Sequence, residues 1–125
     1  MSHSKPKFQE KYGNFIGGEF VAPKSGEYFE NTSPTDGKLI AKYPRSNKDD
    51  VDAAIDAARA AEGEWSKTSA TERSILLNKI ADMLEENLDE FAAVDTYDNG
   101  KPIRETTMAD TPLAIDHFRY FAGAI

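Results

Sequence analysis

The residue types that are absent from this chain limit its chemistry as strongly as those present. Its 125 residues include no cysteine and two histidines, His3 and His117. Without thiols the chain can form no disulfide, no thiolate metal site and no cysteine-derived covalent intermediate. The two histidines do not have a spacing typical of metal ligands. We therefore expect neither cysteine-based catalysis nor an ordinary zinc site from these residues.

Carboxylates are abundant, and two of them could form a catalytic acid and base pair. Several border predicted helix ends or polar helix faces: Glu62, Glu64, Glu85, Glu86, Asp89 and Glu90. A catalytic acid needs burial or a neighbouring charge that raises its pKa, and nothing in the sequence isolates one of these groups. We interpret them as a solvated helix surface. His117 lies on an apolar helix face, which favours a core or interface residue over a catalytic base.

One loop, Asp98–Pro102, has a composition that suggests binding. It places a carboxylate, an amide and a glycine at a predicted helix end, and such oxygen atoms can bind a hard cation. A carboxylate at a helix C-terminus also lies at the negative end of the helix dipole, which favours a compensating cation or hydrogen bond. The alternative is a plain glycine-capped helix end, and the residues alone favour it. The chain has no glycine-rich phosphate-binding motif.

The first third of the chain is predicted to form a small, mostly antiparallel sheet. Residues 14–21 pair two apolar runs across Gly17 and Gly18, which is typical of a two-residue hairpin because glycine tolerates a positive φ. Residues 27–32 and 38–43 are predicted strands, joined by a turn that contains proline and glycine.

Helical periodicity begins at Ser46. The first helix is predicted to start with a capping box at Ser46–Asp49 and to end at Gly63. A second helix starts with a complete box at Ser69–Glu72. A break with a fresh cap is predicted near Asn87, and a third helix follows it.

The third helix is predicted to stop at Asn99 and Gly100, and Pro102 is expected to prevent it from resuming. A last helix contains Thr111 and Pro112 near its start. Its apolar face is predicted to be Leu113, His117, Tyr120 and Phe121, widened by Phe118 and Ala122. This helix reaches Ile125 without a polar cap, which we interpret as an interruption of a longer chain.

Composition narrows the class of protein. With 39% hydrophobic and 30% charged residues the chain is in the globular range. A net charge of -7 argues against nucleic acid and anionic membranes as partners. No apolar run approaches the roughly 20 residues needed to cross a bilayer, and no secretory signal follows the basic N-terminus. The expected location is the cytoplasm.

Several segments together resemble the N-terminal part of the aldehyde dehydrogenase superfamily. Their order and spacing make the resemblance specific. The sequence of the final segment most resembles that of bacterial enzymes for acetaldehyde and other short aliphatic aldehydes. The segments are Phe15–Val21, Asn31–Gly37, Ala57–Ala61, Trp65–Ser66, Glu72–Arg73, Leu76–Leu77, Ile80–Asp82, Asp98–Pro102 and Asp116–Gly123.

The resemblance implies oxidation of an aldehyde to a carboxylic acid, with NAD+ or NADP+ accepting a hydride. In this family a cysteine thiolate attacks the aldehyde and a glutamate activates water. Those residues and the loop that holds the cofactor phosphates lie downstream of the matching region. The resemblance therefore implies that this chain contains no catalytic and no cofactor-binding residue, is inactive alone and binds neither cofactor tightly.

The resemblance also implies a fold and a few site residues. It implies an incomplete α/β domain, α+β as an isolated piece, with the leading part of a coenzyme-binding domain at residues 11–125. Residues 1–10 are expected to form a flexible tail because they carry serine, lysine, proline and glutamine with a single aromatic residue. By analogy, Asp98 and the carbonyl of Thr32 would hold a monovalent cation. Leu113 would line the aldehyde tunnel, and Phe118 lies just over one turn further along.

Three hypotheses follow for the chain as a whole. The leading one is a fragment of an aldehyde dehydrogenase, whose partners would be the rest of that chain, the aldehyde and further copies in a homo-oligomer. The alternatives are a stand-alone interaction module derived from a dehydrogenase lobe and a degenerate protein without activity. The residues do not distinguish NAD from NADP or identify the aldehyde.

Overall fold

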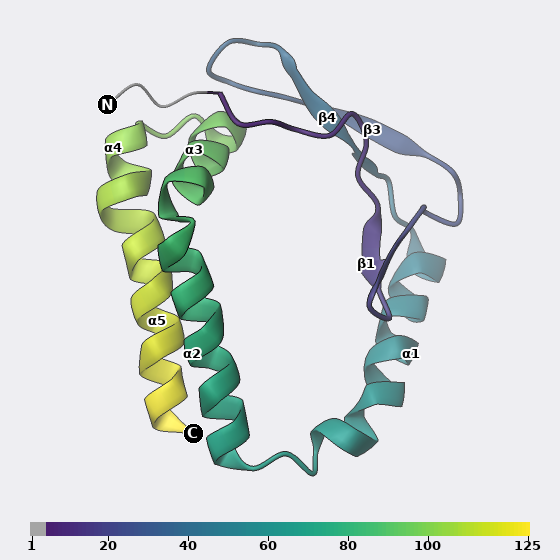
Figure 1. Cartoon of the computed structure of the whole chain (residues 1–125). Coiled ribbons are helices and arrows are strands. Elements are labelled where there is room, and N and C mark those ends of the chain that lie inside the picture. Colours follow the sequence, from purple (N-terminus) through teal and green to yellow (C-terminus); the bar gives the residue numbers. More distant parts are fainter. Residues whose placement is uncertain (1–4) are drawn as a thin grey trace. The chain divides into compact units, whose positions relative to one another are not determined.

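The computed structural model in Figure 1 describes residues 5–125, which divide into two compact units. We call them the strand unit, made of Phe8–Thr32 and Gly37–Lys67, and the helical unit, made of residues 5–7, Ser33–Asp36 and Thr68–Ile125. Each unit is described by itself. The two units contain two small antiparallel sheets and the helices that follow them, which confirms the α+β character expected of this piece.

The first hairpin of the strand unit is the one predicted from Gly17 and Gly18. Strands β1 (Asn14–Ile16) and β2 (Glu19–Val21) pair antiparallel with Phe15 opposite Phe20. The two glycines have φ of 63° and 89°. Two positive φ angles in a two-residue loop match the twist of the flanking strands, so glycine at both positions specifies this hairpin.

The second hairpin forms a separate sheet. Strands β3 (Tyr28–Thr32) and β4 (Leu39–Pro44) pair antiparallel, as predicted. The expectation of one continuous sheet is wrong, because β1 and β2 form a two-stranded sheet of their own. The reason lies at the second edge of β4, where Lys42 donates its N–H to the carbonyl of Glu10 and accepts from the N–H of Tyr12. Residues 10–12 thus occupy the edge that β1 would have needed.

Helix α1 (Lys48–Trp65) begins one residue later than predicted. Its capping box joins Asn47 to Asp50 instead of Ser46 to Asp49. The hydroxyl of Ser46 forms hydrogen bonds with the side-chain amide of Asn14, at 2.9 and 3.0 Å, so it does not cap the helix. Gly63 does not end the helix, since it has no positive φ and one interior glycine costs a helix only about 1 kcal/mol.

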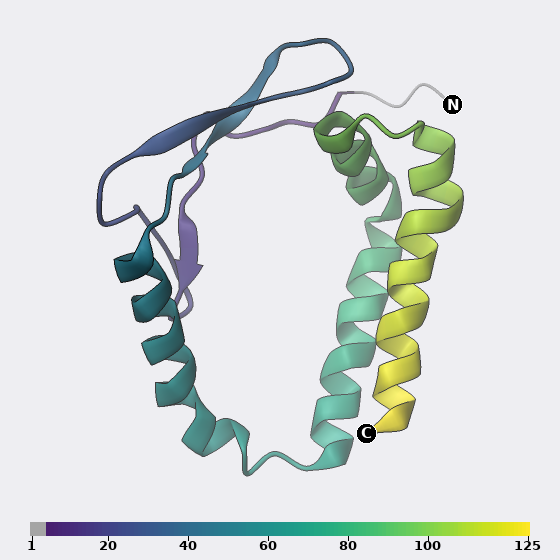
Figure 2. The same cartoon turned by 180° about the vertical axis from the view of Figure 1, so that it is seen from behind.

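The helical unit is built on α2 (Ala70–Glu86), which lies alongside the last helix, α5 (Thr111–Ala124), in both views (Figures 1 and 2). The complete capping box at Ser69 and Glu72 is confirmed. The break near Asn87 is also confirmed, and α3 (Leu88–Asn99) follows it. Asn87 is not a side-chain cap, because its amide donates to the carbonyl of Met83 at 2.8 Å.

The chain resumes a helix directly after Pro102, contrary to the prediction. Pro102 precedes the short helix α4 (Ile103–Glu105), the π-helix η1 (Thr106–Asp110) and α5 without a break. Proline obstructs a helix interior but suits its start, where no N–H is required. The buried Thr106 fastens this segment to α3, since its hydroxyl lies 2.9 Å from that of Thr96.

Helix α5 buries a face that overlaps only partly with the one predicted. Its buried residues are Thr111, Ile115 and Ala122, and only Ala122 belongs to the predicted face. Phe118 is half-buried, and the four central residues of the predicted face are exposed: Leu113, His117, Tyr120 and Phe121. The helix carries apolar residues nearly all round, so periodicity alone could not select the buried side. The contact is set by shape, because the fully buried Ala81 of α2 lets α5 approach closely.

Candidate functional site

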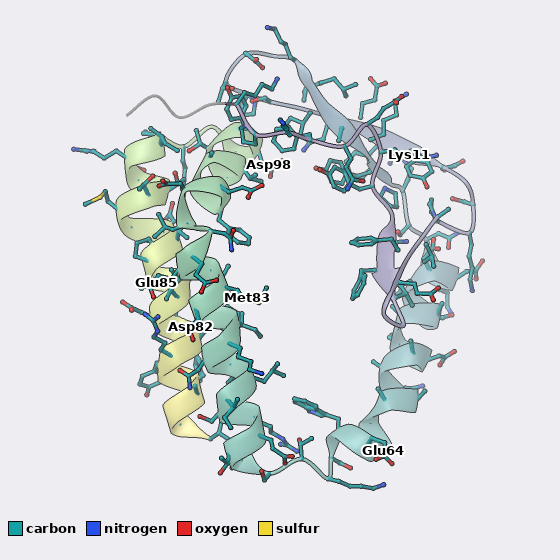
Figure 3. The ribbon with its side chains drawn as sticks, in the orientation of Figure 1. Lys11, Glu64, Asp82, Met83, Glu85 and Asp98 are labelled. Atoms are coloured by element: carbon teal, nitrogen blue, oxygen red, sulfur yellow. The ribbon has the colours of Figure 1, made fainter. Side chains whose placement is uncertain are left out.

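Two of the segments that carry the family resemblance meet within the helical unit. Ser33 is only 2% exposed, and its hydroxyl donates to the carbonyl of Tyr97 at 2.6 Å. The same hydroxyl lies 2.7 Å from that of Thr35, whose N–H also points at it. Asp98, labelled in Figure 3 at the end of α3, directly follows Tyr97. The turn at Ser33–Asp36 is therefore fixed against the end of α3.

Gly100 makes the close approach at this junction possible. It has a φ of 83° and ends α3 with an N–H bond to the carbonyl of Thr96 at 2.9 Å, as predicted. A Cβ atom at this position would lie 3.0 Å from Cγ of Pro34. Both the left-handed backbone and the contact with Pro34 therefore require glycine.

The rest of the loop is held by its own polar groups. The amide of Asn99 donates to Asp95 at 2.5 Å, and its oxygen accepts from the N–H of Lys101 at 2.7 Å. The ammonium of Lys101 pairs with the carboxylate of Asp110 at 2.8 Å, which raises the pKa of Lys101. The loop is thus bonded both to α3 before it and to the π-helix after it.

The two predicted cation ligands belong to different units. Asp98 is an exposed residue in the helical unit, and Thr32 ends β3 in the strand unit. No group of three or more His, Asp or Glu side chains within residues 5–125 is arranged to hold a metal ion. The site at Asp98 and Thr32 remains a prediction.

The sequence places Ser33 in a turn but gives no prediction of its contact with Tyr97, which joins the two segments. The two residues are 64 positions apart and neither is charged. The one available signal was a small hydroxyl residue placed before proline at a strand end, a position where serine commonly bonds to nearby backbone.

Two groups of carboxylates bear on acid catalysis, those predicted to form a solvated surface and those whose pKa is shifted. All six interpreted as a solvated surface are exposed, which confirms that interpretation. Where a carboxyl pKa is shifted among the described residues, it is lowered: by backbone N–H groups at Asp50, by Ser69 at Glu72 and by Arg119 at Glu85. A catalytic acid would need the opposite shift.

The labelled residues Asp82 and Glu85 lie on α2 and bind Arg119 of α5 at 3.3 and 2.5 Å (Figure 3). These pairs are partly exposed, so they orient the two helices more than they stabilise them. His117 is exposed on α5, so it is not a core residue of this chain. Leu113, the predicted tunnel residue, is 56% exposed on the same helix.

Each unit also presents an exposed apolar groove. The groove between α2 and α3 has a volume of about 480 Å³ and is lined by Ile80, Met83, Leu84, Asn87, Glu90, Phe91 and Val94. The groove on α1, of about 500 Å³, is lined by Ile55, Ala58, Arg59, Ala61, Glu62 and Trp65. Neither lining carries a cluster of cationic side chains that would bind phosphate groups.

Comparison with known proteins identifies the family. The sequence pattern that defines the aldehyde dehydrogenase family matches residues 20–125. The chain belongs to this family. It is 58% identical to the long-chain-aldehyde dehydrogenase of an Acinetobacter species over all 125 residues, which are 25% of that enzyme. It is also 58% identical to the acetaldehyde dehydrogenase of Pseudomonas aeruginosa, covering 94% of this chain and 23% of that one.

The solved structures of aldehyde dehydrogenases contain the same fold. The NAD+ complex of the Bacillus cereus enzyme superposes with a TM-score of 0.87 at 36% identity, over 91% of this chain and 24% of that one. The chain thus spans about a quarter of its relatives and corresponds to their N-terminal portion. None of its helices within residues 5–125 has the length and hydrophobicity of a membrane span.

Proposed function

We propose that this chain is the N-terminal part of an NAD(P)-dependent aldehyde dehydrogenase, which oxidises an aldehyde to a carboxylic acid, and that the chain alone does not catalyse this reaction. The observation that carries the proposal is the combination of 58% identity over the whole chain with coverage of only a quarter of the relative. The absence of cysteine supports the second half, because no thiolate is available to attack an aldehyde.

The residues present do not fit a dinucleotide cofactor. Several related structures contain NAD+, but this chain has no glycine-rich phosphate-binding loop, and its grooves between α2 and α3 and on α1 are apolar. NAD or NADP therefore belongs to the complete enzyme, and tight binding to this chain is not expected. The contribution of residues 1–125 is structural: they supply helices and strands on which other parts of an enzyme are positioned.

The partner that best accounts for the apolar grooves is the remainder of the dehydrogenase chain. Exposed groups on α1 and α2 include Val51, Ile55, Leu76 and Met83. Apolar faces of this extent are stable when another layer of structure covers them. The complete enzyme is expected to be a homo-oligomer in the cytoplasm.

The substrate is proposed as an aliphatic aldehyde without a defined chain length. Two relatives of equal identity are named for acetaldehyde and for long-chain aldehydes, so the resemblance of this region does not separate the two classes. We propose Leu113 as a residue that contacts the aldehyde on its way to the site, and its exposure on α5 is compatible with this role.

A chimera tests the proposed role. This chain replaces the matching 125 residues of the Acinetobacter relative, and NAD+ or NADP+ reduction is measured with acetaldehyde and a long-chain aldehyde. We expect the chimera to keep activity within about tenfold of the parent, since over half of the residues are identical. The isolated chain is expected to give no turnover above a heat-treated sample.

Two outcomes would contradict the proposal. A folded, cofactor-binding chimera that lacks activity would show that this chain cannot serve as a dehydrogenase segment. Turnover by the isolated chain would show that the reaction does not need the family's cysteine.

A further inference from the structure

We infer that Asn99 and Gly100 form a deamidation site that the folded end of α3 protects and that local unfolding exposes. The inference rests on the geometry of this loop and is independent of the proposed enzymatic role. It concerns a covalent modification of the chain's own backbone, for which the reactants are an asparagine amide, the next residue's N–H and water.

The reaction has two steps, ring closure with loss of ammonia and then hydrolysis. In the first, the backbone nitrogen of Gly100 forms a bond to Cγ of Asn99, and the side-chain nitrogen leaves as ammonia, carrying the proton from the Gly100 N–H. In the second, water opens the resulting cyclic imide at one of its two C–N bonds. The product has either an aspartate at position 99 or an isoaspartyl linkage, in which the main chain runs through the former side chain.

Gly100 makes this dipeptide reactive, and the structure explains why glycine is favoured here. A glycine after asparagine leaves its nitrogen sterically open, since it has no Cβ. Any other residue would meet Cγ of Pro34 at 3.0 Å and would be strained at a φ of 83°. The tight junction with Pro34 therefore keeps a chemically vulnerable pair on the exposed surface.

The folded loop blocks the first step by holding each reacting group. The Gly100 N–H is bonded to the carbonyl of Thr96 at 2.9 Å, so its nitrogen faces the helix and not the Asn99 side chain. The Asn99 amide nitrogen is bonded to Asp95 at 2.5 Å, and its oxygen to the Lys101 N–H at 2.7 Å. Ring closure requires these bonds to break, which happens only when the end of α3 opens.

Deamidation would then prevent the loop from closing again. A carboxylate at position 99 would face Asp95 one helical turn away, where the amide now donates a hydrogen bond. Like charges at this spacing repel, and both lie at the negative end of the helix dipole. An isoaspartyl linkage would also lengthen the main chain next to the Pro34 contact. The modification thus traps a locally unfolded state.

The test measures deamidation of the full 125-residue chain at mildly alkaline pH, with a stabilising osmolyte in the buffer because the isolated chain is expected to be weakly stable. Peptide mass spectrometry follows the replacement of NH2 by OH at Asn99, in buffer and in guanidinium chloride. Asn78 and Asn87, which precede Lys79 and Leu88, serve as internal controls. We expect conversion at Asn99 alone, and a rate in buffer about tenfold or more below the rate in denaturant.

A variant separates local protection from overall folding. Asp95→Ala removes the acceptor of the Asn99 amide while placing the best helix former in α3, so it should leave the helix intact. We expect the rate at Asn99 to rise several-fold in buffer and to be unchanged in guanidinium chloride. Asp89→Ala, at the other end of α3, is the matched control and should change neither rate.

Three results would overturn the inference. One is an equal rate at Asn99 in buffer and in denaturant, and another is conversion at Asn78 or Asn87 as fast as at Asn99. The third is an Asp95→Ala variant whose rate in buffer equals that of the unmodified chain.

Discussion

Asp50 is a buried carboxylate of the strand unit. It is 4% exposed and accepts the N–H of Asn47 at 3.0 Å and of Lys24 at 2.8 Å. The bond from Asn47 and then that from Lys24 lower its pKa below the ordinary value of 3.8. One side chain thus both closes the capping box of α1 and fastens the loop before β3.

A lowered pKa makes this contribution dependent on pH. Because the folded state favours the carboxylate, its stabilising effect is complete above pH 3.8 and is lost as pH falls through the lowered pKa. We expect Asp50→Asn to be less stable than the unmodified chain at neutral pH, and the difference to close in acid. Urea denaturation across this pH range, in a stabilising osmolyte, measures it.

Asp49→Asn is the control for this prediction, because Asp49 is the exposed neighbour on the same helical turn. A pH-independent difference between Asp50→Asn and the unmodified chain would show that the charge of Asp50 is irrelevant.

Asp98 is one of the two ligands of the predicted cation site, and the chimera allows a test of that prediction. If Asp98 and the Thr32 carbonyl bind a monovalent cation, about ten times its Kd should stabilise the enzyme by about 1.4 kcal/mol. Asp98→Asn should lose most of that gain, whereas Asp89→Asn should keep it. Thermal denaturation in potassium, sodium and a bulky organic cation measures the effect.

A structure of the complete enzyme checks the same prediction directly. A ligand pair that shares one cation must lie within about twice a bond of roughly 2.3–2.6 Å. A larger separation between the Asp98 carboxylate and the Thr32 carbonyl would exclude the proposed site in that conformation.

The pairing of α5 with α2 is the dominant contact at the level of whole elements. Ile115 is 3% exposed in this contact, whereas Leu113 is 56% exposed on another face. We expect Ile115→Ala to lower the free energy of unfolding by about 2–5 kcal/mol, because it leaves a cavity. Leu113→Ala should change it by no more than about 0.5 kcal/mol.

Chemical denaturation followed by circular dichroism compares the two variants in the osmolyte used above. Equal losses at both positions would mean that α5 packs in solution through the apolar face predicted from periodicity, and not through the face buried here.

At the scale of the whole molecule, most of the large apolar side chains of the described residues are exposed, and the buried apolar residues are mostly small. Its buried hydrophobic residues are mostly alanines, with Ile40 and Ile115 the larger ones, while Phe91, Trp65 and Phe121 are 47–57% exposed. Each large apolar side chain left in water forgoes about 1.5–3 kcal/mol. Several of them equal much of the roughly 5–15 kcal/mol by which domains are stable.

We therefore expect the 125-residue chain to be weakly stable and to self-associate. Sedimentation should show species larger than a monomer, and heating should give no sharp transition. A monodisperse monomer with cooperative unfolding at roughly 45–65 °C would favour the alternative, a stand-alone interaction module. The chimera is the control, since its apolar grooves would be covered and it should melt cooperatively.

Local signals in the sequence were sufficient for most elements. The hairpin at Gly17 and Gly18, the capping box at Ser69 and the stop at Gly100 were all predictable. Each depends on atoms a few residues apart, through a positive φ or a bond between side chain and nearby backbone. The family resemblance was equally readable, because it depends on the order of short segments along the chain.

Tertiary structure decided the features that depend on residues far apart in the sequence. Residues 10–12 are hydrogen-bonded to the edge of β4 at which β1 would pair in one continuous sheet. The side chain of Ser46 is bonded to that of Asn14, so α1 is capped by the next residue instead. Ile115 was buried instead of Leu113 because α5 is apolar nearly all round and only the shape of α2 selects a face. The junction of Ser33 with Tyr97 joins residues 64 positions apart. A sequence records the hydrogen-bonding and apolar capacity of each residue, but only the folded chain determines which distant partner uses that capacity.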